Sequence, residues 1–350
     1  MKLCKVIELT GSEKLARPIM TLGYQELLAK GTVIKKEYIP KILQLGINEV
    51  FIEDEGPSPE QVAILKESVG DLFKKKVKSV LERHIYTDSA SLKELTETAD
   101  SIIKNILEND SLVEQIYDIK ERSADIYEHS VSVCSLSVLV AIKLKLKRST
   151  IHDLGVASLF HDIGLRYLDF DYQNTCLKDL SEKNLIEFRK HPAFAYTSLE
   201  KEKWLSSKAK TMILQHHERL DGSGYPLHVR EFEKETEILQ VCDAFDEMIC
   251  GIGCERAKVY EAVEFLKVSK YEQFSAETVD ALLEFTAVYP AGTVVLLNSG
   301  EMGVIIRQNK QFPERPVMNI IKDKDGNNLS EERICDLLQE YSLFIEKVIM

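Results

Sequence analysis

The spacing of hydrophobic residues divides the chain into three parts. Near the N-terminus, KVIEL (residues 5–9) and EVFIE (49–53) alternate like strands, and KKEYIPKILQLG (35–46) between them has helical spacing with a terminal glycine. From about residue 58 to 288, apolar positions recur at helical intervals. Beyond residue 288, TVVLL (293–297) and MGVIIR (302–307) are joined by a polar, glycine-bearing turn and predict strands. Another such run, VMNII (317–321), is followed by the turn-like KDKDGNN (322–328).

This pattern predicts a mainly α-helical protein with two small flanking parts. We expect an α/β module over residues 1–56, a helical connecting region over 57–118, a helical domain over 119–287 and a β-rich subdomain over 288–350. A length of 350 residues allows two or three domains at about 150 residues each. The type of the last segment, CDLLQEYSLFIEKVI (335–349), is left open.

Composition narrows the partners and the compartment. A formal net charge of −12 disfavours a nucleic-acid polymer or an anionic membrane as the main partner, since both require a basic face. The central apolar run VLVAI (138–142) is far shorter than the ~20 residues of a membrane helix, and the N-terminus lacks a signal-peptide pattern. Seven cysteines without a disulfide-like spacing indicate reduced thiols. We therefore expect a cytoplasmic protein.

Five of the eight histidines lie on or at the ends of separate predicted helices. Metal sites in helical bundles are built from such ligands, which project inward from facing helices. A single histidine on an apolar face is more often a hydrogen-bonded core residue, but five within one helical region favour a metal site. They are His129, His161, His191, His216 and His217.

Carboxylates accompany these histidines. Asp162 directly follows His161, and Asp243 lies in the apolar stretch EILQVCDAFDEMI, where an unpaired carboxylate would be costly. Asp125 precedes His129 by one helical turn. Imidazole and carboxylate ligands without thiolate favour Fe or Mn over Zn. Two such ions can share a hydroxide and hold a phosphate between them, as in phosphodiester hydrolysis.

Two motifs resemble those of the HD superfamily of metal-dependent phosphohydrolases, and more narrowly the HD-GYP family. They are HDIG (161–164) and HHERLDGSGYP (216–226), and the second is long and specific. The resemblance extends over about residues 119–266 and implies an HD-type helical bundle. It also implies hydrolysis of cyclic di-GMP to pGpG or GMP by two or three divalent metal ions through a bridging hydroxide.

The resemblance assigns roles to individual residues. Asp162 would be the bridging carboxylate and, with His161, the catalytic centre, while Asp125 stands where some relatives have a third-metal glutamate. The implied metal ligands are His129, His161, Asp162, His191, His216, His217 and Asp243. The implied substrate contacts are Arg219, Asp221, Gly224, Tyr225, Pro226 and Arg256; for the loop itself, a helix-terminating turn is the alternative interpretation.

Two departures from the family pattern keep other functions open. Leu165 occupies the position of a lysine that contacts phosphate in the family, and the stretch CGIGCERAKVY (250–260) lacks the family's basic pattern. The alternatives are a catalytically weak cyclic di-GMP receptor and a hydrolase of another cyclic dinucleotide or phosphoester. The flanking modules are expected to engage a signalling partner or a second copy of the chain.

Overall fold

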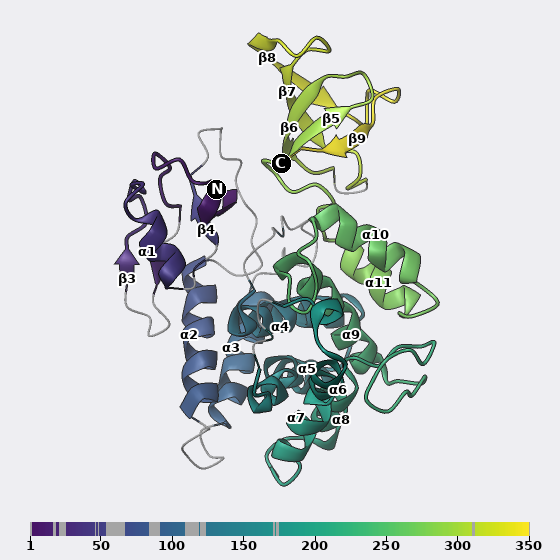
Figure 1. Ribbon diagram of the computed structural model, residues 1–350. Helices are drawn as coiled ribbons and strands as arrows, with labels where there is room; N and C mark the ends of the chain where they lie inside the picture. The colour runs from purple at the N-terminus through teal and green to yellow at the C-terminus, as the bar shows by residue number, and fades with distance from the viewer. Residues whose placement is uncertain are drawn as a thin grey trace. The chain divides into compact units, whose positions relative to one another are not determined.

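The structure is a computed structural model that divides into two compact units, residues 1–61 and 62–350. It describes residues 2–16, 19–20, 26–45, 47, 49–53, 67–83, 92–108, 119, 124–170, 172, 175–309 and 312–349. The boundary predicted after residue 56 and the one after residue 118 involve residues outside this described part. The overall class is as predicted: a helical bundle with a C-terminal antiparallel sheet and a small N-terminal α/β unit (Figure 1).

The N-terminal unit contains two short antiparallel strand pairs and one helix. Strand β1 (Lys2–Lys5) pairs with β4 (Glu49–Ile52), β2 (Ile19–Met20) pairs with β3 (Glu26–Leu28), and α1 spans Ile39–Gln44. The strand predicted over residues 5–9 is wrong, because Val6–Glu8 form the 3-10 helix η1. Val6 and Leu9 are both buried while Ile7 is 77% exposed, and this three-residue spacing suits a 3-10 turn.

The second unit is built around one helical core (Figure 1). The segment predicted to connect the domains packs into this same core through Val77 and Ile102. Its helices are α2 (Glu67–Arg83), α3 (Glu94–Leu107), α4 (Ile126–Lys143), α5 (Arg148–Phe160), η4 (Ile163–Tyr167), η5 (Leu177–Asp179), α6 (Glu182–Phe188), α7 (His191–Leu199), α8 (Ser207–Gln215), α9 (Lys234–Cys250), α10 (Val259–Ser269) and α11 (Ala276–Leu283).

Helix α4 is the most apolar of these elements. By length and composition it could cross a membrane, but 67% of its 18-residue window is buried inside the protein. A helix that is apolar on all sides belongs in the middle of a core. It packs against α5 and α9, and these three helices carry much of the site described below.

The C-terminal part forms a five-stranded antiparallel sheet. Its strands are β5 (Val294–Leu297), β6 (Met302–Arg307), β7 (Val317–Lys322), β8 (Asn328–Asp336) and β9 (Ile345–Val348), in the order β8-β7-β6-β5-β9. Val295, Leu297 and Ile305 point into its own small core. The three strands predicted from hydrophobic alternation are confirmed, and the terminal segment of open type supplies the end of β8 and all of β9.

Candidate metal centre

Seven of the sequence-predicted side chains converge in the interior of the helical bundle. Each of the seven residues is at most 5% exposed. They come from α4, from the residues that directly follow α5 and α8, from the start of α7, and from α9. The seven are His129, His161, Asp162, His191, His216, His217 and Asp243.

Three of the histidines are oriented by the same local hydrogen bond. The Nδ1 atoms of His161, His191 and His216 lie 2.7–2.8 Å from the backbone carbonyl oxygens three residues earlier, which belong to α5, α6 and α8. The last carbonyls of a helix have no partner within the helix, so a nearby donor satisfies them. A carbonyl oxygen can only accept, so each Nδ1 carries the proton and each Nε2 is left with its lone pair.

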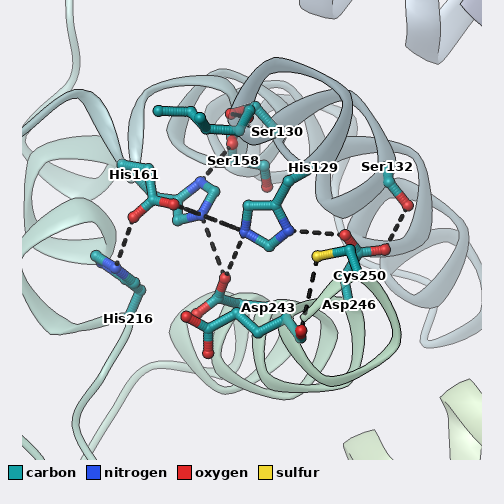
Figure 2. Close-up of polar contacts among 12 residues, drawn as sticks. His129, Ser130, Ser132, Ser158, His161, His216, Asp243, Asp246 and Cys250 are labelled. Carbon is teal, nitrogen blue, oxygen red and sulfur yellow. Dashed lines mark hydrogen bonds and ion pairs between the residues drawn. The ribbon is translucent and has the colours of Figure 1, made fainter. Parts of the chain in front are cut away.

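His129 reaches the same state through a side chain. Its Nδ1 lies 2.7 Å from Asp246 Oδ2, and the Ser132 hydroxyl donates to Asp246 Oδ1 at 2.6 Å. Its Nε2 then faces His161 Nε2 at 3.1 Å, as Figure 2 shows. His191 Nε2 and His216 Nε2 face each other at the same distance. Two lone pairs so close together require a shared cation or proton between them.

The ligand atoms form two groups. The first ligand group is His129, His161 and Asp243; the second ligand group is Asp162, His191, His216 and His217; within each group they lie within 4.8 Å of one another. Asp162 connects the groups, because its Oδ2 lies 3.4 Å from His161 Nε2 and its Oδ1 lies 3.3 Å from His191 Nε2. This is the geometry expected of a bridging carboxylate.

The electrostatics of the centre favour positive charge. Burial opposes ionisation of Asp162, but His161 and His191 outweigh it and hold the pKa of this carboxyl well below its usual value. Burial likewise opposes charge on His161, yet the Asp162 and Asp243 carboxylates raise its pKa to about 10. In contrast, burial and then the His161 charge lower the pKa of His216 to about 3.

These residues fit divalent metal ions. The Nε2 lone pairs converge, two carboxylates lie among them, and Asp243 Oδ2 is buried without a hydrogen bond to the described residues. A metal ion would supply the positive charge that the cluster attracts, and its binding would displace protons. The ligands are imidazole and carboxylate groups, which first-row transition-metal ions such as Fe, Mn and Zn accept.

Glycines bring the helix ends close enough to form the centre. A Cβ on Gly164 would lie 1.9 Å from the His191 carbonyl oxygen, so only glycine lets η4 pack against the start of α7. A Cβ on Gly224 would lie 2.4 Å from the His217 carbonyl oxygen. The backbone N–H of Tyr225 donates to that oxygen at 3.1 Å, and its ring stacks on His217 with 4.7 Å between centroids.

Several predicted residues lie outside the two ligand groups. Asp125 caps α4 by accepting from the Tyr127 and Glu128 N–H groups, and it pairs with Lys74 at 2.7 Å. The structure therefore gives no support to Asp125 as a metal ligand. Asp221 is exposed and accepts from the Ser223 N–H within the loop.

The other predicted substrate contacts have diverse surroundings. Arg219 donates to the His216 and Glu218 carbonyls and lies over the Phe274 ring, so it stabilises the end of α8. Arg256 lies half-buried in the turn after α9, where its Cβ faces Gly251. Pro226 follows Tyr225 through a cis peptide bond at the edge of the loop.

Three carboxylates near the centre, Asp246, Glu247 and Glu218, were not predicted from the sequence. Asp246 and Glu247 follow Asp243 by three and four residues on α9, so they lie on the same helix face as Asp243. This i, i+3, i+4 spacing was the available signal. Glu218 is fully buried and accepts from the Leu227 and His228 N–H groups, which ties the loop to the histidine pair; its position after two histidines gave no indication of this role.

Replacing Asp246 by asparagine is expected to weaken metal binding by about 10–100-fold, because carboxylates that orient a ligating histidine typically contribute this much. The Asp246 carboxylate holds the His129 ring in place and raises the basicity of that ring, and the amide of asparagine lacks the negative charge that does both. Isothermal titration with Mn²⁺ measures the effect. Ser130→Ala is the matched control, since the Ser130 hydroxyl donates to the Ile126 carbonyl one turn earlier on the same helix. Equal affinity of Asp246→Asn and wild type would contradict the assignment.

Two protein-family models match the chain. One, described as an HD domain, matches residues 112–274. The other, described as a KOW domain associated with HD domain, matches residues 294–350. The helical region that contains the centre thus matches an HD domain, and the terminal five-stranded sheet falls within the KOW match.

Several curated relatives are cyclic di-GMP phosphodiesterases. One, from Pseudomonas aeruginosa, is 27% identical over 293 residues, which are 81% of this chain and 70% of the relative. The response regulator RpfG of Xanthomonas campestris pv. campestris is 24% identical and the match covers 67% of this chain and 66% of RpfG. PdeB of Borreliella burgdorferi is 23% identical, and the match covers 63% of this chain and 59% of the PdeB sequence.

A solved structure shares the fold. The protein Bd1817 from Bdellovibrio bacteriovorus, described as an HDG"Y"P protein, aligns with a TM-score of 0.55 and 18% identity. The alignment covers 80% of this chain and 97% of Bd1817. Together with the curated relatives, this confirms the resemblance to the HD-GYP family.

Proposed function

We propose that this protein, whose HD domain resembles those of HD-GYP proteins, is a metal-dependent phosphodiesterase that hydrolyses cyclic di-GMP to pGpG or GMP. One observation carries the proposal: two groups of buried imidazole and carboxylate ligands meet at a single bridging carboxylate, Asp162. The names of the curated relatives supply the substrate class.

The first and second ligand groups would each hold one divalent ion, and we propose Fe or Mn. When bound, two such ions supply an activated water as the nucleophile and stabilise negative charge on the phosphate. The protein's contribution is orientation. The helix-end carbonyls and Asp246 fix the ring protons on Nδ1, so every Nε2 of His129, His161, His191 and His216 is available as a ligand.

The loop that ends in Tyr225 forms one wall of the centre. The Tyr225 ring stacks on His217, and the Arg189 guanidinium lies 5.8 Å from the centroid of the Tyr225 ring. Gly224 allows the loop backbone to approach the histidine pair, and Glu218 holds its far end. We infer that this wall excludes bulk water from one side of the ligands.

A second candidate function is a receptor that binds cyclic di-GMP with little turnover. The observation that favours this function is Leu165. This residue is 1% exposed and uncharged, and it occupies the position at which family members have a phosphate-contacting lysine. The complete set of metal ligands weighs against this reading, because a receptor does not need them.

One assay separates the candidates. Protein loaded anaerobically with Fe²⁺ or Mn²⁺ is incubated with cyclic di-GMP, and the products are resolved by chromatography. The proposal expects pGpG or GMP in the loaded protein and none after chelation. Tight binding without product would favour the receptor, and neither binding nor product would point to another phosphoester.

A further inference from the structure

Glu247 is an acidic residue beside the centre that belongs to neither ligand group. It lies on α9, one turn after Asp243, and its Oε1 is 4.0 Å from His217 Nε2. Ligand atoms of Glu247, Asp243 and His217 all lie within 4.8 Å of one another. The Glu247 side chain is 20% exposed, against 1% for Asp243 and 5% for His217. Of these three side chains, it is therefore the one that solvent or substrate reaches most easily.

The second oxygen of Asp243 points to the same place. Asp243 Oδ1 lies 3.1 Å from His129 Nε2 and 3.2 Å from His161 Nε2, so it serves the first ligand group. Asp243 Oδ2 lies 3.7 Å from His217 Nδ1 and is buried without a hydrogen bond to the described residues. The two oxygens of Asp243 thus face different residues, Oδ1 toward the first ligand group and Oδ2 toward His217. Asp162 likewise directs its two oxygens to different histidines.

Two carboxylates held together in a buried region repel each other strongly, because the low local dielectric hardly screens their charges. Burial also makes an unpaired carboxylate oxygen costly. A divalent cation between them would remove both penalties. His217 cannot relieve both carboxylates, since a neutral imidazole has only one N–H donor, and the lone pair on its other nitrogen is required by the second ligand group.

We propose that Asp243 Oδ2 and Glu247 bind an additional divalent cation beside His217. The ligands are oxygen atoms, which favours a hard ion such as Mn²⁺ or Mg²⁺, with water or a phosphate oxygen completing its coordination. The proposal rests on the proposed function, because Asp243 also serves the first ligand group. It assigns to Glu247 the role that the sequence suggested for Asp125, which instead caps α4 and pairs with Lys74.

The test counts metal ions. The full chain is stripped with a chelator and titrated with Mn²⁺ by calorimetry, and bound metal is measured by mass spectrometry after desalting. Wild type should bind one more ion per chain than Glu247→Gln, or bind its weakest ion at least about tenfold more tightly, the size of a coordinating partner's effect. Asp125→Asn is the matched control and should bind as wild type does, since asparagine is an equally good helix cap.

Glu247→Asp guards against a folding artefact, because it keeps the carboxylate and should retain the additional ion with weaker affinity. Equal stoichiometry and affinities in wild type and Glu247→Gln would overturn the proposal, as would loss of one ion from Asp125→Asn alone. Loss of every ion from a folded Glu247→Gln would place this residue in the main centre and also overturn it. If wild type binds the additional ion but does not hydrolyse cyclic di-GMP, the proposed function fails and this site stands.

Discussion

Replacement of Asp162 by alanine is expected to reduce cyclic di-GMP hydrolysis by at least about 10³-fold, the upper end of what one preorganised charge-stabilising group contributes. Asp162 faces both ligand groups, with Oδ2 toward His161 and Oδ1 toward His191. Its loss would remove one ligand from each of the two proposed ions, together with the negative charge that Asp162 would place between them. We therefore expect metal content to fall together with activity.

Metal analysis and the product assay together check this prediction. Asp179→Ala is a suitable control, because Asp179 is an exposed residue of η5 and should leave both quantities unchanged. A folded Asp162→Ala protein that keeps its full metal content would contradict the bridging role, whatever its activity.

Replacement of Gly164 by alanine is expected to destabilise the protein by about 3 kcal/mol, the upper part of the range for overpacking. The new Cβ would lie 1.9 Å from the His191 carbonyl oxygen and 2.8 Å from the Ala195 nitrogen, and both are backbone atoms. The start of α7 must move, and His191 moves with it. Metal binding should therefore weaken in addition to the loss of stability.

Gly155→Ala provides the comparison within the same core. A Cβ there would meet only side-chain atoms, the nearest being Ile103 Cδ1 at 3.4 Å. Because alanine is favoured over glycine inside a helix by about 0.5–1 kcal/mol, this variant should be neutral or slightly stabilised. Chemical denaturation measures both variants. Equal stability of Gly164→Ala and Gly155→Ala would show that η4 and α7 are not held together as described.

Local sequence signals were enough to predict the helical bundle, the strands of the C-terminal sheet and the seven side chains that converge in the bundle. Hydrophobic spacing predicts the helices and the strands, and the unusual positions of histidine and aspartate residues predict the converging side chains. The strand predicted over residues 5–9 was wrong because Val6 and Leu9 share one buried side, which strand alternation does not allow. The choice between these periods depends on what the segment packs against.

The parts of the centre that were missed depend on packing. Asp246 and Glu247 look like ordinary helix residues until α9 is seen to turn this face toward His129 and His217. Asp125 has the spacing of a ligand, but Lys74 from α2 lies beside it, and no local pattern indicates that pairing. The need for Gly164 likewise arises from its contact with α7, 27 residues further along the chain at His191.

We expect the buried imidazoles and carboxylates to bind metal ions on both sides of Asp162. Anomalous diffraction from crystals soaked in Mn²⁺ would locate these ions. We expect one strong peak among His129, His161 and Asp243, and another among His191, His216 and His217, with Asp162 in contact with both. Crystals that show no anomalous signal among these side chains at saturating Mn²⁺ or Fe²⁺ would contradict this expectation.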